Sequence, residues 1–430
     1  MESRTLDPGL RLIQQADMKN KIVLVRVDHN VVKKGKIKDP YRIDATIGTL
    51  YAIAAKGGHP ILMTHVGRPR DKKTGRIDCR EGEAVGPIVQ YLKNRLPVDI
   101  DVPEFPIDAE RGILEFDDAI EEAIEDLKTG RTGMIYLPNT RWFMGEQSGG
   151  PEREDFARSL AGLADIFVND AFGSWQAHVS TYDVAKRLPS YAGALLQKEL
   201  LNLHSVLQPE RPFLGIIAGA KYDTKIGPLK ALFKKADHLI LGGILYNAFL
   251  SAKYGVNIAG VSDDDRALAM DLVALDEKEE KILEMPYLVE SDTTEEKIEG
   301  RHRTVDIRNF KEGMDFKYFL DIDPKCFEGK KVEEVIGSAK TIFINAVMGL
   351  MPSFFEGSRS LYRLIASNGK ALKLFGGGDT LQELKNFCPG IYLSGLDDPS
   401  TYYFTGGGSV LAAIEQGSPY QLKPIQALMA

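Results

Sequence analysis

Short apolar runs alternate with helix-like stretches along the first half of the chain, and each run ends in polar residues. The clearest runs are KIVLVRVDHN, PILMTHVGRPR, GMIYLPNTRW and ADIFVNDAFG. Between them lie stretches with helical spacing, such as TIGTLYAIAAKGG and EGEAVGPIVQYLKNRL. This alternation is typical of a parallel sheet that is covered on both faces. Ligands bind beyond the carboxyl ends of such strands, so the polar clusters predict a binding edge.

The second half repeats the alternation, but its apolar runs end in small residues. The runs RPFLGIIAGAK, DHLILGGILYNAFL, KTIFINAVMGL, KALKLFGGG and TYYFTGGG finish in Gly, Ala or Asn. The first half therefore offers charged side chains at its edge, whereas the second half offers bare backbone. We predict an α/β protein with two doubly wound parallel-sheet (Rossmann-like) domains that face a cleft and are joined by a helical hinge.

A helical stretch followed by prolines marks the join between the two halves. The stretch runs from Ala192 to about Leu207, and Pro209 and Pro212 end it. The predicted division is an N-terminal domain at 1–190, a hinge helix at 191–207, a C-terminal domain at 208–410, and a tail at 411–430 that packs back on the N-terminal domain.

Length and composition agree with two soluble domains. A chain of 430 residues is too long for one ordinary core, and 43% hydrophobic with 27% charged residues is typical of globular proteins. The net charge of −7 argues against nucleic acid as the main partner. The first residues are polar, and no apolar run reaches the roughly 20 residues of a membrane span. Three scattered cysteines suit a reducing compartment, so we expect a cytoplasmic protein without a membrane partner.

Two glycine triplets stand between an apolar run and a helix-like run near the end of the chain. They are Gly376–Gly378 in LFGGGDT and Gly406–Gly408 in FTGGGS. A helix that begins at glycines exposes its first N–H groups, which bind anionic oxygen together with the helix dipole. Asp379 can hold a magnesium ion, and Thr380 can bind phosphate oxygen. Either triplet alone is equally consistent with a tight turn, and neither matches a P-loop or a GxGxxG fingerprint.

Basic side chains follow the strands of the first half: Arg42, His65, Arg68 and Arg141. Arginine suits phosphate and carboxylate because its planar fork donates paired, charge-assisted hydrogen bonds. Each of these residues alone is more often a surface salt-bridge residue, but their coincidence at one edge favours an anion site. Asp28 and Asn30 at the same edge can hold the hydroxyls of a small polar ligand; capping of a helix or turn is the alternative.

Lys221 and Lys225 lie four residues apart in AGAKYDTKIGPLKALF, which places both on one face of a predicted helix. Two ammonium groups there repel each other unless an anion lies beside them. A plain surface helix is the alternative interpretation. With the glycine triplets on the same sheet, neutralisation of a polyphosphate is the better one.

Taken together, these motifs resemble the phosphoglycerate kinase family along almost the whole chain. VLVRVDHNV resembles the family's VRVDFNVP, THVGRP its SHLGRP, and NTRW its NVRF, while VNDAFG is the family string itself. LPSYAGALLQKEL, AGAKYDTKIG, LDIDPK, GGGDT and TGGGS then follow in the expected order.

The resemblance implies a hinge-bending kinase of glycolysis and gluconeogenesis. Such a transferase exchanges a phosphoryl group between 1,3-bisphosphoglycerate and Mg-ADP, giving 3-phosphoglycerate and Mg-ATP. We expect a monomer that acts on these small molecules. By the likeness, the N-terminal lobe holds phosphoglycerate through Asp28, Asn30, Arg42, His65, Arg68 and Arg141. The C-terminal lobe holds the nucleotide through Lys221, Lys225, Gly242, Gly243, Asn345, Gly377, Gly378, Asp379 and Thr380. Asp379 is the implied Mg²⁺ ligand, and the implied catalytic residues are Arg42, Lys221, Gly377 and Gly407.

Three departures from the family pattern fall at recognition positions. After VNDAFG the family reads TAHRAH, whereas this chain reads SWQAH, so Gln176 stands where an arginine reaches substrate phosphate. WNGPMGVFE reads INAVMGLMP here, and the glutamate that holds the ribose is replaced by Pro352 or displaced to Glu356. Asp323 replaces a glycine beside the expected base pocket, where it could repel phosphate or bind a different base.

These departures leave two alternatives to a phosphoglycerate kinase. One is a kinase of the same fold with an altered nucleotide or acyl-phosphate substrate. The other is a non-catalytic binding protein derived from the fold, which the full set of charged residues argues against.

Overall fold

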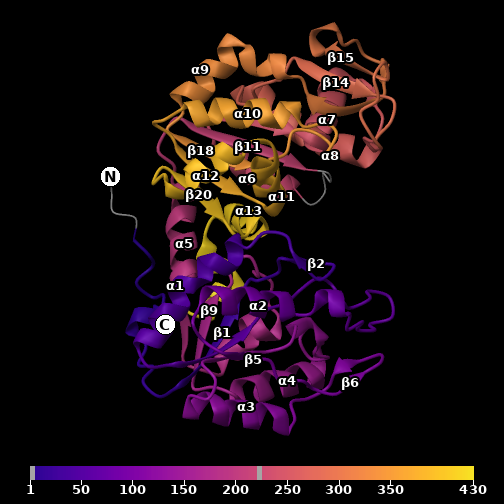
Figure 1. Ribbon diagram of the computed structural model, residues 1–430. Helices are drawn as coiled ribbons and strands as arrows, with labels where there is room; N and C mark the ends of the chain where they lie inside the picture. The colour runs from indigo at the N-terminus through magenta and orange to yellow at the C-terminus, as the bar shows by residue number, and fades with distance from the viewer. Residues whose placement is uncertain (1–4, 220–224) are drawn as a thin grey trace. The chain divides into compact units, whose positions relative to one another are not determined.

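The computed structural model describes residues 5–219 and 225–430, and the chain forms two compact units. Unit 1 comprises the residues up to Leu201 together with Tyr420–Ala430, and unit 2 comprises Asn202–Pro419. Figure 1 shows both units, each with helices packed around a sheet. No helix among the described residues is both long enough and apolar enough to cross a membrane.

Unit 1 is built on a six-stranded parallel sheet with the strand order β10-β9-β1-β4-β8-β5. The strands are β1 (Ile22–Val27), β4 (His59–Met63), β5 (Ile100–Asp101), β8 (Met134–Tyr136), β9 (Ile166–Asp170) and β10 (Ser190–Ala192). Every residue of β1, β8 and β9 is buried. Consecutive strand residues point to opposite faces, so both faces of this sheet are covered, as the continuous apolar pattern predicted.

The helices of unit 1 supply that cover. They are α1 (Tyr41–Ala55), α2 (Gly86–Arg95), α3 (Asp118–Thr129), α4 (Gly150–Gly162) and the short α14 (Lys423–Gln426). On one face of β1, Val23 and Val25 pack in a core with Ile43 and Leu50 of α1 and Ile88 of α2. The other face of β1 carries Leu24 and Arg26. Two small hairpins complete the unit, β2 (Val32–Lys33) with β3 (Lys36–Ile37) and β6 (Ile107–Asp108) with β7 (Gly112–Ile113).

Helix α2 is shorter than the sequence pattern suggested. The helix-like stretch begins at Glu81, but only a turn of 3-10 helix forms at Glu81–Glu83, and α2 begins at Gly86. Pro87 occupies the first turn, the place where a missing N–H removes no helical hydrogen bond. The proline therefore sets the start of the helix.

Unit 2 contains a five-stranded parallel sheet with the order β12-β11-β18-β19-β20. The strands are β11 (Phe213–Gly219), β12 (His238–Gly242), β18 (Thr341–Asn345), β19 (Leu372–Gly376) and β20 (Thr401–Phe404). The helices are α6 (Ile226–Lys235), α7 (Gly243–Tyr254), α8 (Asp263–Glu279), α9 (Lys330–Ser338), α10 (Glu356–Ser367), α11 (Gly378–Phe387), α12 (Pro389–Asp397) and α13 (Gly407–Gln416). Two parallel sheets of this kind confirm the predicted fold class.

Smaller strands extend unit 2 beyond its main sheet. An antiparallel sheet of order β15-β14-β17 joins β14 (Tyr287–Ser291), β15 (His302–Asp306) and β17 (Tyr318–Ile322). A separate pair joins β13 (Asn257–Ile258) and β16 (Asp315–Phe316). In Figure 1, β14 and β15 lie at the end of this unit away from β20.

Helix α5 (Ala194–Leu207) contains the boundary between the two units. It begins two residues later than the sequence suggested, because Ala192 pairs with Asn169 as the last residue of β10. The carboxylate of Asp170 accepts a hydrogen bond from Leu196 N in the first turn of α5. At the other end of the chain, Leu10 bridges to Met429 within unit 1.

Candidate functional site

The basic residues of unit 1 lie at the carboxyl ends of its strands. His65 and Arg68 follow β4, and Arg141 lies in the helical turn Thr140–Trp142 that follows β8, the neighbour of β4. Arg42 is the second residue of α1. Burial, followed by the charges of Arg26, Arg141 and Arg42 among others, lowers the pKa of His65, and the charge of Arg68 acts on Arg141. These side chains therefore share one edge of the sheet, which we call the basic edge.

Asp28 and Asn30 connect the segments of the basic edge. Arg42 Nη1 lies 3.1 Å from Asp28 Oδ2, and Asn30 Oδ1 accepts a hydrogen bond of 3.0 Å from Gly67 N. The second carboxylate oxygen, Asp28 Oδ1, is buried and has no hydrogen-bond partner within residues 5–219 and 225–430. An unpaired buried oxygen is costly, so Asp28 is suited to accept a hydrogen bond from a ligand hydroxyl.

The charged groups around Arg141 indicate an excess of positive charge at the basic edge. Arg141 Nη1 donates a hydrogen bond of 2.5 Å to Gly67 O. Burial lowers the pKa of the guanidinium, the charges of Arg26 and Arg68 lower it further, and the carboxylates of Glu146 and Asp28 oppose the shift. The guanidinium stays protonated because arginine has a pKa above about 12. An edge with this surplus of cations favours an anionic ligand.

Sequence reasoning missed two charged residues behind the basic edge, Arg26 and Glu146. Each is only 1% exposed. A signal for Arg26 was present in the sequence, because it is the lone charged residue inside the apolar run IVLVRV. A charge in a strand that is covered on both faces must be paired. No local pattern identified Glu146 as the other charge.

The segment around Gln176 adds hydrogen-bonding groups but no charge near this edge. Gln176 Oε1 lies 3.2 Å from His178 Nε2. Burial, followed by the charges of Arg141 and Arg26, lowers the pKa of His178 to about 4. The ring is therefore neutral at pH 7.

In unit 2, Asn345 connects three segments at the carboxyl edge of the sheet. It is the last residue of the central strand β18. Its Oδ1 accepts a hydrogen bond of 2.6 Å from Lys225 Nζ, and its Nδ2 donates one of 2.6 Å to Gly376 O. A cation and the first glycine triplet are thereby fixed beside one buried amide.

The two glycine triplets meet next to Asn345. A Cβ atom at Gly407 would lie 2.4 Å from Gly377 Cα, and one at Gly377 would lie 2.8 Å from Asn345 Nδ2. Gly377 has a φ of +109°, which favours glycine. Gly377 is the N-cap of α11, and Gly406 is the N-cap of α13. Two helix N-termini without side chains therefore stand together, and we call this arrangement the glycine edge.

Charged and hydroxyl side chains flank the glycine edge. Burial lowers the pKa of Lys225 to about 8, and the charge of Asp379 opposes this shift. Asp379 is exposed in the first turn of α11, and Thr380 beside it is buried. The described part of the chain has no group of three or more His, Cys, Asp or Glu residues placed to hold a metal ion. A single carboxylate nevertheless fits Mg²⁺, which proteins often hold by one or two carboxylates together with substrate phosphates.

Lys221 lies outside the described residues. Helix α6 begins at Ile226 with Lys225 as its N-cap, so Lys225 precedes the helix, and the prediction that it lies on a helix face is wrong. Pro228 in the first turn is a residue that favours a helix start. The N-cap position brings Lys225 to Asn345.

The pair Gly242 and Gly243 forms the tight junction between β12 and α7. Gly243 has a φ of +59°, and a Cβ there would lie 2.9 Å from Gly219 O. A Cβ at Gly242 would lie 2.7 Å from Met348 Sδ. These glycines let β12, β11 and the segment after β18 approach closely.

Two carboxylates that the sequence offered for base or ribose recognition are engaged within unit 2. Asp323 Oδ2 accepts a hydrogen bond of 2.5 Å from Thr304 Oγ1, and its Oδ1 accepts one of 3.0 Å from Lys325 N. Glu356 Oε1 lies 2.8 Å from Lys297 Nζ, whereas its Oε2 is buried with no hydrogen-bond partner among the described residues. Pro352 is exposed and has no carboxylate to offer.

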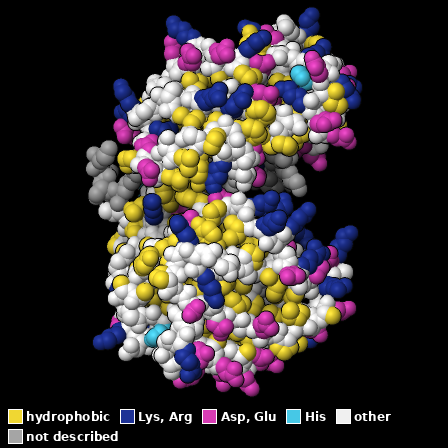
Figure 2. Space-filling model, in the orientation of Figure 1, with side chains coloured by type: hydrophobic (Ala, Val, Ile, Leu, Met, Phe, Trp, Pro, Cys, Tyr) yellow, Lys and Arg dark blue, Asp and Glu magenta, His cyan; other side chains and the backbone are white. Residues whose placement is uncertain are grey.

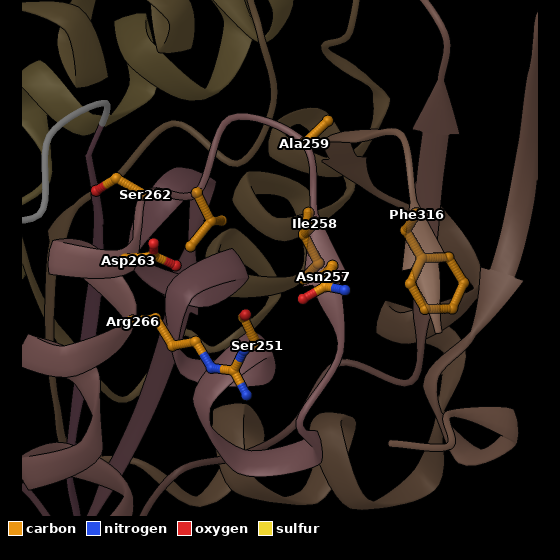
Figure 3. A pocket seen from close by; sticks show the side chains of 9 residues that line it. Ser251, Asn257, Ile258, Ala259, Ser262, Asp263, Arg266 and Phe316 are labelled. Carbon is orange, nitrogen blue, oxygen red and sulfur yellow. The ribbon is translucent and has the colours of Figure 1, made fainter. Parts of the chain in front are cut away.

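A separate hollow of about 280 Å³ lies in unit 2 near the carboxyl end of α7 (Figure 3). Its lining includes Ser251, Asn257, Arg266 and Phe316. Ser251 Oγ donates to Val256 O, and Asn257 Nδ2 donates to Asp315 Oδ1, so these polar groups already have partners. None of the residues that line this hollow belongs to α11, α13 or the glycine triplets, so it is distinct from the glycine edge.

The protein has two Rossmann-like units, one with a basic edge and one with a lysine beside paired helix N-termini. This combination is typical of a phosphotransferase. Groups of these kinds can bind and neutralise phosphate, and phosphoryl transfer needs little else from a protein.

Comparison with known proteins gives the family. The family model described as phosphoglycerate kinase matches residues 13–417. A phosphoglycerate kinase from Dictyoglomus turgidum is 33% identical over 94% of this chain and 95% of its own, and one from Thermus thermophilus is 34% identical over 95% and 98%. The solved phosphoglycerate kinase structure from Coxiella burnetii aligns with a TM-score of 0.73 at 26% identity, covering 97% of this chain and 98% of its own. The chain belongs to the phosphoglycerate kinase family, which confirms the resemblance.

The structure of another phosphoglycerate kinase, from Pyrococcus horikoshii, aligns with a TM-score of 0.74 at 22% identity over 97% of this chain and 98% of its own. At that identity the likeness supports the shared fold alone.

Proposed function

We propose that this protein catalyses the reversible transfer of a phosphoryl group between 1,3-bisphosphoglycerate and ADP, as a cytoplasmic monomer. The observation that carries the proposal is the glycine edge, where Lys225, Asn345 and two helix N-termini converge. Such a site binds a phosphate chain through backbone N–H groups and one ammonium group. Family membership supplies the identity of the acid and the nucleotide.

The basic edge is the proposed site of 3-phosphoglycerate. Arg42, His65, Arg68 and Arg141 are assigned to its phosphate and carboxylate. Asp28, through its unpaired Oδ1, and Asn30 are assigned to its hydroxyl side. The surplus of positive charge around Arg141 supports binding of a small polyanion.

The glycine edge is the proposed site of the nucleotide phosphates. Lys225, Asn345, Gly377, Gly378 and Thr380 are assigned to the phosphate chain, and Gly242 and Gly243 to the base pocket. We assign Gly407, Lys221 and Arg42 to the phosphoryl group in transfer. Of these, Arg42 also belongs to the proposed acid site. Hydrogen bonds from backbone N–H groups position the reactants, and fixed positive charge offsets the charge of the phosphates. Both effects lower the activation barrier of phosphoryl transfer.

Asp379 is the proposed magnesium ligand. Its exposure in the first turn of α11, beside Gly378, lets the carboxylate reach a cation held mainly by nucleotide phosphates. When bound, Mg²⁺ would supply charge neutralisation for those phosphates.

A coupled assay with 3-phosphoglycerate and Mg-ATP tests the proposal, and Lys225→Met tests its basis. We expect turnover in the wild type and a fall in kcat of about 100-fold or more in the variant, the usual scale for losing a group that stabilises transferring charge. Lys230→Met is the matched control, because Lys230 lies on α6 and pairs with Asp271 at 2.7 Å. Wild-type kcat in Lys225→Met, with circular dichroism unchanged in both variants, would contradict the role of the glycine edge.

A kinase with another nucleotide or acyl phosphate is the second candidate. The engagement of Glu356 by Lys297 and the neutral Gln176 favour it. The same assay with guanosine, inosine and pyrimidine nucleotides, and with other phosphorylated acids, decides between the two. A larger kcat/KM for any of these than for ATP and 3-phosphoglycerate would establish the second candidate. No turnover with any of them, together with no nucleotide binding in calorimetry, would leave a non-catalytic binding protein.

A further inference from the structure

A buried chain of hydrogen bonds runs behind the basic edge and ends on His65. Arg26 Nη2 lies 2.9 Å from His65 Nδ1, Arg26 Nε donates to Ser180 Oγ at 2.9 Å, and Arg26 Nη1 donates to Val27 O. Ser180 donates to Glu146 twice, from Oγ to Oε1 at 2.5 Å and from N to Oε2 at 2.9 Å. Every member of the chain is buried.

The direction of the last hydrogen bond follows from the chemistry of arginine. A guanidinium has five N–H donors and no acceptor, so His65 Nδ1 must accept the hydrogen bond from Arg26. A neutral imidazole that accepts at one nitrogen carries its proton on the other. The ring proton of His65 therefore lies on Nε2.

The His65 ring lies within the field of several cationic side chains. Within the described ranges, 5–219 and 225–430, no residue accepts a hydrogen bond from Nε2. The charged or titratable groups that act on the ring are Arg26, Arg141, His178 and Arg42, and no carboxylate is among them. An N–H donor on a ring that lies within the field of three guanidinium groups has an anionic oxygen as its natural partner.

We propose that Arg26, held by Glu146 through Ser180, is a positioning residue that fixes His65 as a neutral Nε2–H donor to an anionic oxygen of the acid substrate. The proposal rests on the proposed function, because it takes the basic edge as the acid site. Arg26 itself is 1% exposed and uses its Nε, Nη1 and Nη2 within the protein, so it acts through His65 and does not touch the substrate.

The arrangement excludes acid–base chemistry at His65. Burial and then the charges of Arg26 and Arg141 lower the pKa of His65 well below its usual 6.5, so the ring stays neutral at physiological pH. Its one basic nitrogen, Nδ1, is occupied by Arg26. His65 therefore donates a hydrogen bond without gaining or losing a proton, and its contribution to binding is constant between about pH 6 and 8.

Nitrogen-15 NMR of the full-length protein without substrate tests the tautomer directly. We expect His65 to show a protonated Nε2 and an unprotonated Nδ1 from pH 6 to 8. Arg26→Lys cannot donate to His65 and Ser180 in the same fork geometry, so we expect it to mix the tautomers. Arg70→Lys is the control, because Arg70 Nη1 donates to Ser148 Oγ and does not contact His65. A protonated Nδ1 in the wild type would overturn the proposal.

A double-mutant cycle tests whether Arg26 acts through His65. We expect Arg26→Lys to raise the KM for 3-phosphoglycerate roughly tenfold, about the worth of one hydrogen bond, with kcat and the KM for ATP nearly unchanged. In a His65→Ala background Arg26→Lys should add nothing. An equal rise in KM with and without His65 refutes the positioning role.

If Arg26→Lys does not fold, Ser180→Ala removes the same anchor with a smaller change. A wild-type tautomer of His65 and a wild-type KM for 3-phosphoglycerate in Ser180→Ala would contradict the role of the hydrogen-bond chain. The NMR result also separates this inference from the proposed function. If His65 shows the expected tautomer but the protein does not turn over 3-phosphoglycerate, only the proposed function is refuted.

Discussion

At the scale of single residues, what matters is whether a polar group is already bound within the fold. Both carboxylate oxygens of Asp323 accept hydrogen bonds within unit 2, so Asp323 cannot replace the family's ribose contact without breaking one of them. Asp28 and Glu356 are the opposite case, because each has one carboxylate oxygen in an ion pair and the other buried without a partner among the described residues. Such differences depend on neighbours that lie far away in the sequence.

Gln176→Arg should strengthen binding of the acid. Gln176 is exposed beside His178, whose pKa is lowered by burial and then by the charge of Arg141, so a guanidinium placed here would add a charge to the basic edge. We expect the KM for 3-phosphoglycerate to fall about threefold to tenfold at low ionic strength, within the range of one charge-assisted hydrogen bond. Trp175→Arg, at the adjacent exposed position, controls for the added charge alone. A KM that is unchanged, or that falls equally in both variants, would contradict a specific role for position 176.

At the scale of elements, the same strand–glycine–helix junction occurs at several ends of the unit 2 sheet. The junctions β19–α11 and β20–α13 pack against each other so tightly that neither central glycine has room for a methyl group. The junction β12–α7 uses Gly243 to approach Gly219 in the same way. Close backbone packing at the carboxyl edge brings helix N-termini from separate segments to one place.

Gly407→Ala should impair both activity and stability. Its Cβ would lie 2.4 Å from Gly377 Cα, so the two triplets must separate and the N–H groups of α11 and α13 must move. We expect at least a tenfold fall in kcat and a lower Tm. Gly337→Ala in α9 is the matched control, because no atom lies within 4 Å of its Cβ position and alanine favours helix by about 0.5–1 kcal/mol. The control should keep its kcat and gain slightly in Tm; equal effects in both variants would show that the packing of the triplets is unimportant.

At the scale of the whole molecule, a negative net charge coexists with a local basic surface. The chain carries −7, which by itself disfavours the approach of anionic substrates. The β2–β3 hairpin opposes this, because Lys33, Lys34, Lys36 and Lys38 are all exposed and have no ion pair within the described residues. Figure 2 shows Lys and Arg side chains gathered around this hairpin. The hairpin joins Asn30 to Arg42 along the chain, so it flanks the basic edge.

Replacing Lys33, Lys34 and Lys36 together by Gln should weaken substrate capture in a salt-dependent way. We expect the KM for 3-phosphoglycerate to rise severalfold at low ionic strength with kcat unchanged. The difference from wild type should vanish as salt rises, because the screening length falls from about 30 Å at 0.01 M to about 10 Å at 0.1 M. The same change at the exposed Lys330, Lys331 and Lys340 of unit 2 is the control. A difference in KM that persists at high salt would indicate a direct contact instead of steering.

The sequence by itself determined the class of fold and most of the groups that bind phosphate. Continuous apolar strands with polar or glycine ends follow from local patterning, so the two parallel sheets and the residues at their carboxyl edges could be predicted. Tertiary structure decided which of these groups are engaged and which are open. Lys225 reaches Asn345 only because α6 starts at Ile226, and the triplets meet only because β19 and β20 are neighbours. Arg26, Ser180 and Glu146 lie up to 154 residues apart, so no local pattern could join them to His65. Side-chain pairing between distant segments is set by packing, whereas strand and helix patterns are set by the periodicity of the chain itself.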